Sequence, residues 1–241
     1  MVMDSSLRID RRMFVLGAAA TLASCATKPI ALDRQALASI HSVALPTPGF
    51  PNQPGVAVLN GVATRLPGVF GLIGAVATAT TMSHRQDALV AIFAEKGFNG
   101  EAYFNEGLKQ RLAARRLTPS PMPADPRRDD FLAAYPSFAN DGALLDVVVT
   151  GYGLMAYDDS DASPYRPAVG LKIRLVAADK SVLMQDTLTN LGIQVDPQSP
   201  NDAPTAAFTT FGDVRNNPDG AVAAMKQAFD YAANVVDRRL A

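Results

Sequence analysis

Cysteine and histidine are scarce in this chain, which has one cysteine and two histidines among its 241 residues. A single cysteine excludes a disulfide bond within the chain and any zinc site built on several cysteine ligands. Two histidines leave most metal and acid–base constellations incomplete. An excess of positive charge is also missing, because 22 lysines and arginines face 23 aspartates and glutamates. The basic surface of a nucleic-acid-binding protein is therefore not expected, and we predict no metal, no cofactor and no nucleic-acid partner.

Apolar residues, by contrast, make up 48% of the chain, which is too many for a largely disordered protein. A chain of this length can bury one substantial core, and length alone suggests one or two domains. The sequence shows no internal repeat and no linker that divides it. One domain is the economical interpretation.

The N-terminal segment is typical of an export signal. Three arginines, the last two at Arg11 and Arg12, precede an uncharged run over residues 13–23. This run is too short to span a membrane, which needs about 20 residues, but it suits the apolar region of a signal peptide. It ends in Leu-Ala-Ser-Cys at Cys25, which resembles the lipobox of bacterial lipoproteins, where a cysteine is lipidated before cleavage.

This resemblance implies that residues 1–24 are removed as a signal peptide and that Cys25 carries the acyl chains, palmitate among them, that anchor the protein. Residues 25–38 then form a lipidated tether, and residues 39–241 form the domain. A lone cysteine is more often a buried core residue, but this one directly follows the charged and apolar regions of the signal. Acyl chains at one terminus suffice for stable anchoring, because each buried methylene contributes about 0.8 kcal/mol.

Arg11 and Arg12 also resemble the twin-arginine export signal, since one spacer and then Phe14 follow the pair. Asp10 departs from that pattern, in which serine or threonine is usual, so an ordinary secretory signal with two incidental arginines is the alternative. The residue after the cysteine is Ala26, not the aspartate that commonly retains lipoproteins in the inner membrane. The resemblance therefore implies an outer-membrane lipoprotein that faces the periplasm, with the membrane as one partner.

The hydrophobic patterns of the remaining chain predict a mixed α/β domain. Residues 144–157 are apolar on both alternating faces, which is typical of a central strand. A first strand is expected over residues 40–46, and two strands that follow the central one complete an antiparallel meander. Periodicity and capping residues predict helices over residues 83–96, 101–116, 129–135 and 218–240. We expect an α/β fold tending to α+β, in two or three layers, with helices flanking a mixed sheet.

An uncharged, glycine-rich stretch over residues 66–83 fits no regular element. Its 18 residues approach the length of a membrane span, but Pro67 and the glycines argue against a lipid-facing helix. Two interpretations stay open. The stretch is either a buried small-residue segment of the domain, or a surface for self-association or membrane contact formed by Gly68, Gly71 and Gly74.

Motifs for catalysis or nucleotide binding are incomplete. Residues 151–156 match the Gly-x-Gly-x-x-Ala dinucleotide pattern, but the aspartates and proline that follow leave no room for the helix that would hold a pyrophosphate. The acidic run at 158–161 lacks the glutamate that closes a calcium loop. His41, in a predicted strand, and His84, in the first turn of a helix, are expected to be structural or solvated. The tyrosines near the acidic run are candidates for a recognition surface, namely Tyr152, Tyr157 and Tyr165.

The order of elements resembles that of envelope lipoproteins with a periplasmic α/β domain. After the lipobox come an early strand ending in Leu-Pro, a glycine-rich segment, helices, a long apolar strand, two antiparallel strands and a C-terminal helix. This layout, over residues 38–240, is similar to the curli secretion lipoprotein family and to N-terminal domains of the TolB type. The resemblance implies a non-catalytic binding, scaffolding or assembly role, often in an oligomer, with other envelope proteins or further copies of the chain as partners.

Two other functions stay open from the sequence. One is an auxiliary lipoprotein that carries a lipid or a small apolar ligand, in an apolar cavity expected beneath residues 66–83. The other, favoured less, is a hydrolase that uses carboxylates such as Asp158 or Asp159.

Overall fold

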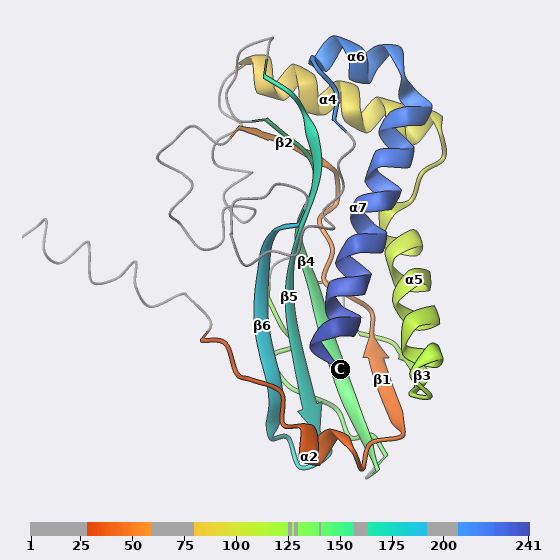
Figure 1. Ribbon diagram of the computed structural model, residues 1–241, viewed down its shortest axis with the longest axis vertical. Helices are drawn as coiled ribbons and strands as arrows, with labels where there is room; N and C mark the ends of the chain where they lie inside the picture. The colour runs from red at the N-terminus through yellow and green to blue at the C-terminus, as the bar shows by residue number, and fades with distance from the viewer. Residues whose placement is uncertain are drawn as a thin grey trace, which may run out of the picture.

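The computed structural model of the chain describes residues 28–58, 80–124, 127, 130–139, 141–156, 163–191 and 207–241. These residues form one mixed sheet with helices packed on it (Figure 1). The strand order is β3-β1-β4-β5-β6, and β2 also pairs with β4. The strands are β1 (Ser42–Pro46), β2 (Gly55–Val58), β3 (Thr118–Met122), β4 (Gly142–Ala156), β5 (Arg166–Ala177) and β6 (Val182–Leu191). The expected α/β fold with a mixed sheet is confirmed.

β4 is the central strand, as its apolar sequence predicts. It is 15 residues long, and every residue except Thr150 is buried. β5 and β6 follow it as the predicted antiparallel meander. On its other side β4 pairs in parallel first with β1 and then with β2. Between these two strands, Gly49 makes an isolated parallel bridge to Val148.

The helices cover one face of the sheet and one of its ends. α5 (Gly100–Ala114) and α7 (Pro218–Arg239) lie side by side along the face, whereas α4 (Thr80–Glu95) and α6 (Phe211–Asn216) lie at the end near β2 (Figure 1). α2 (Arg34–Leu37) is a single turn ahead of β1. α7 begins as predicted, with the side chain of Asn217 accepting from the Gly220 N–H and Pro218 at the first helical position. No helix in the described ranges is both long and apolar enough to cross a membrane.

Both edges of the sheet are protected. At one edge, Thr118 donates its N–H to the His41 carbonyl and Met122 accepts from the Thr47 N–H, so alternate residues of β3 face β1. The two residues that alternate with them and face outward are Pro119 and Pro121, which have no N–H. The outer edge of β3 therefore lacks the donors that an added strand needs at these positions.

At the other edge, residues 28–38 pack against β6. Ile30 and Gln185 exchange backbone hydrogen bonds of 2.7 and 3.0 Å, and the Asp33 N–H donates to the Leu183 carbonyl at 3.0 Å. The Gln185 side chain donates to the Lys28 carbonyl at 2.9 Å. Part of the segment interpreted as a lipidated tether, residues 25–38, thus contacts the sheet through an isolated bridge between Ile30 and Gln185.

Two predicted helices differ from the structure. α4 begins at Thr80, so Ser83 lies inside the helix and not at its cap. The segment predicted as a helix over residues 129–135 has no helix among its described residues. There the Leu132 N–H donates to the carboxylate of Asp146, a partner on β4 that no local pattern reveals. A tertiary contact therefore replaces the intrahelical hydrogen bond.

Candidate functional site

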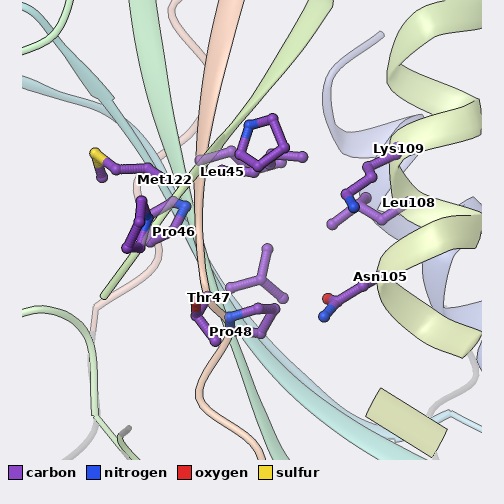
Figure 2. Close-up of a pocket in the computed structure, with 12 residues that line it drawn as sticks. Leu45, Pro46, Thr47, Pro48, Asn105, Leu108, Lys109 and Met122 are labelled. Atoms are coloured by element: carbon purple, nitrogen blue, oxygen red, sulfur yellow. The ribbon is translucent and has the colours of Figure 1, made fainter. Parts of the chain in front are cut away.

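A groove opens between α5 and the strands β1, β3 and β4, and we call it the α5 groove (Figure 2). Its volume is about 380 Å³, within the range of roughly 300–1,000 Å³ that is usual for small-molecule sites. Its floor is apolar and buried. Leu145 and Val147 of β4 are 1% and 2% exposed, and Leu108 of α5 is 2% exposed.

Proline forms much of the wall opposite α5. Pro46 and Pro48 flank the break after β1, and Pro121 and Pro123 lie at the end of β3. Because proline has no N–H, Pro46 and Pro48 cannot donate to β4 between the end of its pairing with β1 at Leu144 and the bridge from Gly49 to Val148. They also make the wall rigid before any ligand arrives, which lowers the entropic cost of binding.

The wall on the α5 side carries two polar side chains. Asn105 and Lys109 are four residues apart, so they project from the same helix face, with Leu108 beside them. Figure 2 shows both pointing from α5 toward the strands. Within the part of the chain that the structure describes, neither side chain has a hydrogen bond or an ion pair.

α5 is held at its distance from the strands by contacts with α7. Arg111 donates to the side chain of Asn234, and Arg115 forms a two-bond ion pair with Asp237. Nearer the start of the helix, the Tyr103 hydroxyl donates to the Asp230 carboxylate at 3.1 Å. Arg111 and Arg115, in the last turn and at the C-cap of α5, therefore both bind α7.

A buried charged cluster lies on the opposite face of the sheet. Asp146 alternates with the groove residues Leu145 and Val147, so its side chain points away from the groove, and it is 0% exposed. Arg127 lies 2.5 Å from one carboxylate oxygen. The Leu132 N–H and the Tyr135 hydroxyl donate to the other oxygen at 2.8 and 3.2 Å.

This cluster fixes the segment after β3 to the sheet. Burial raises the pKa of the Asp146 carboxyl above its ordinary value, because lost hydration outweighs the stabilisation of the carboxylate by the Leu132 N–H and by Arg127. Arg127 also donates to the Thr47 carbonyl at 3.1 Å. The cluster therefore braces the break after β1, where Thr47 lines the groove. We interpret it as structural, because Asp146 has no exposed surface to offer a substrate.

The structure places the other residues singled out by the sequence as follows. Gly153 lies inside β4, so residues 151–156 form a strand and not a nucleotide-binding turn. Its φ is +145°, and a Cβ there would lie 1.9 Å from the carbonyl oxygen of Gly55, so the glycine permits the close approach of β2. His41 precedes β1 and is exposed, as is His84.

The tyrosines proposed for a recognition surface are core residues where the structure describes them. Tyr165 is 0% exposed and Tyr152 is 8% exposed. Tyr152 packs 5.5 Å from the ring of Phe229 on α7, so its ring fills the interface between helix and sheet. Tyr157 lies outside the described residues.

Several predicted sites also lie outside the described residues. They are the lipidation site Cys25, the export-signal pair Arg11 and Arg12, the glycines Gly68, Gly71 and Gly74, and the acidic residues Asp158 and Asp159. The described residues contain no cluster of histidine, cysteine and acidic side chains suited to a metal ion.

Neither the α5 groove nor the Asp146 cluster is predicted by the sequence patterns. A local signal exists for the cluster, since Asp146 is the one charged residue of β4. The groove has no comparable signal, because its walls come from three separate parts of the chain. The prolines of its wall indicate a loop or an edge strand but not a cavity.

Comparisons with known proteins add little. No family model matches the chain, and no curated protein matches it. Among solved structures, one similar chain is a Helicobacter pylori protein described as a neuraminyllactose-binding hemagglutinin homolog. It is 12% identical with a TM-score of 0.35, and the match covers 90% of this chain and 88% of that one. Similarity at this level supports no conclusion about function.

Proposed function

We propose that this chain is a lipid-anchored protein of the bacterial cell envelope with a non-catalytic binding role, and that the α5 groove is its binding site. The N-terminal sequence supports the anchor, since the charged segment, the apolar run and the Leu-Ala-Ser-Cys motif stand in the order of a lipoprotein signal. The outer membrane, with the domain in the periplasm, is the proposed location.

The α5 groove is the observation that carries the binding role. It combines an apolar floor with a small number of polar groups at one side, which is the usual composition of a small-molecule site. This observation favours a protein that carries a lipid or small apolar ligand over one that acts through assembly alone. The groove lies between α5 and the strands, whereas the cavity expected from the sequence falls on residues 66–83, of which the structure describes only 80–83.

Two matched tryptophan variants test the groove. Asn105→Trp places a large side chain in the groove, whereas Gln110→Trp places the same side chain on an exposed position of the same helix. The full chain is extracted from its membrane in polymer-bounded nanodiscs, without detergent, and bound molecules are detected by native mass spectrometry. We expect a ligand mass that wild type and Gln110→Trp share and Asn105→Trp lacks. A ligand retained equally by all three proteins, or found in none, contradicts a binding role for the groove.

The anchor is tested separately by the mass of the N-terminal peptide. We expect the mature chain to begin at Cys25 with acyl chains attached, and the Cys25→Ser variant to lack them and to leave the membrane fraction. An unmodified Cys25 in membrane-associated protein contradicts lipidation. The same native mass spectra report whether further copies of the chain or other envelope proteins are bound.

A further inference from the structure

We infer that the α5 groove binds a single-chain amphipathic carboxylate, that is, a fatty acid anion, with its carboxylate at Lys109 and Asn105 and its tail along the strands. This inference rests on the proposed binding role of the groove and adds the chemical class of the ligand.

The charge of the groove selects the head group. Lys109 is the one charged residue among the described residues that line it, and no acidic side chain lies among them. The ammonium group of Lys109 has no ion-pair partner in the described chain. An anion therefore finds a complementary charge in the groove, and a cation finds none.

The donors of the groove lie together on one wall. Asn105 and Lys109 are one helical turn apart, so an amide N–H and an ammonium N–H converge on ligand atoms beside α5. A carboxylate has two oxygens that each accept such bonds, and bonds of this charge-assisted kind are stronger than neutral ones.

The wall opposite α5 presents few hydrogen-bonding groups to the alkyl tail of a ligand. Its four prolines have no N–H, and the N–H of Thr47 is already donated to the Met122 carbonyl. The hydroxyl of Thr47 is the remaining polar side-chain group on this wall. An alkyl tail loses no hydrogen bonds here and gains contact with the apolar side chains of Leu45, Leu145 and Val147.

Photolabelling tests the orientation and the charge preference. The probes are dodecanoic acid bearing a diazirine on its chain and the dodecanol with the diazirine at the same carbon. Each is irradiated with the full chain in nanodiscs, and labelled peptides are mapped by mass spectrometry. Labelling is normalised to that of the nanodisc lipid. We expect the acid to label residues 105–123 at least about tenfold more than the alcohol does, which corresponds to about 1.4 kcal/mol.

Charge variants separate the role of Lys109 from a general loss of structure. We expect Lys109→Met to abolish the preference for the acid and Lys109→Arg to keep it. Lys28→Met, which removes the same charge beside β6 at the opposite edge of the sheet, serves as the matched control and should keep the preference. A thermal melt confirms that each variant is folded.

Two results would overturn the inference. Equal labelling of the groove by acid and alcohol shows that the head-group charge is not read, and an acid preference that survives in Lys109→Met shows that another residue reads it. Either result leaves the proposed binding role intact if Asn105→Trp still removes a bound ligand that Gln110→Trp retains. The failure of the ligand class is therefore distinguishable from the failure of the binding site.

Discussion

Asp146 shows how a single charged side chain organises the side of the sheet that faces away from the α5 groove. Its carboxylate contacts Arg127 and accepts from the Leu132 N–H, so it draws the segment after β3 onto β4. Removing such a carboxylate leaves the partner cation without its counter-charge and the backbone donor without its acceptor. The residue therefore matters far more for stability than an exposed acid does.

We expect Asp146→Ala to lower the free energy of unfolding by about 3–5 kcal/mol, because the guanidinium of Arg127 stays partly buried without a counter-charge. Asp130→Ala is the control, since Asp130 is exposed and lies 3.5 Å from Lys172, and it should cost less than about 1 kcal/mol. Urea denaturation of both variants measures the difference. Equal losses in the two variants would contradict the role given to Asp146.

Tyr152 predicts how stability depends on alkaline pH. Burial raises its pKa to about 12 in the folded chain from an ordinary value of 10.0. Between these values the unfolded chain releases the phenolic proton while the folded chain keeps it, so the free energy of unfolding falls as pH rises. We expect Tyr152 to contribute a loss of up to about 2–3 kcal/mol between pH 10 and pH 12, so the total loss is smaller in Tyr152→Phe by about this amount. Parallel pH dependences of the two proteins would contradict this.

At the scale of elements, α4 and α5 end with the same hydrogen-bond pattern but different residues. After α4, Gly97 has a φ of +59° and the Phe98 N–H donates to the Phe93 carbonyl. After α5, Arg116 has a φ of +64° and the Leu117 N–H donates to the Leu112 carbonyl. Both ends form the Schellman motif, in which glycine is favoured because it has no Cβ. Arg116 is therefore in a strained conformation that Gly97 avoids.

We expect Arg116→Gly to raise the free energy of unfolding by about 0.5–1 kcal/mol and Gly97→Ala to lower it by about 1–2 kcal/mol. The glycine change costs only backbone strain, since no atom lies within 4 Å of the position that a Cβ would take at Gly97. Thermal denaturation of the two variants provides the measurement. A destabilised Arg116→Gly would show that the arginine side chain makes a contribution larger than the strain.

The elements that the sequence predicted are those whose signals are local. The start of α7 follows from Asn217 and Pro218, and the central position of β4 follows from its unbroken apolar run. The predicted start of α4 and the predicted helix at 129–135 were both wrong. The second was wrong because the Leu132 N–H donates to the distant carboxylate of Asp146. The α5 groove was not predictable for the same reason, since no pattern within one segment shows how α5 stands relative to β1 and β3.

At the scale of the whole molecule, the two sheet edges differ in how they are closed. β6 is covered by residues 28–33, whereas the outer edge of β3 is closed by the outward positions of Pro119 and Pro121. The two prolines protect this edge by removing hydrogen-bond donors and not by covering it, so the edge itself stays exposed. Restoring those donors should therefore make the edge available for pairing between molecules.

We expect the double variant Pro119→Thr and Pro121→Thr to self-associate, because both new N–H groups face away from β1. Ser120→Val is the control, since it adds β-propensity at the residue between them without adding an outward donor. Sedimentation velocity reports the association state. A double variant with the same sedimentation profile as Ser120→Val would show that the prolines do not guard this edge.

The hydrogen bonds of residues 28–33 with β6 also have a mechanical consequence. A force applied through the N-terminus first loads the paired bonds between Ile30 and Gln185 and the bond from Asp33 to Leu183. The α5 groove is lined by β4, β1 and β3, and the nearest of these to β6 is β4, which lies beyond β5 and roughly 10 Å away at the usual spacing of strands. A pull on the N-terminus is thus opposed first at the β6 edge of the sheet, and the strands that line the groove are loaded only after these bonds break.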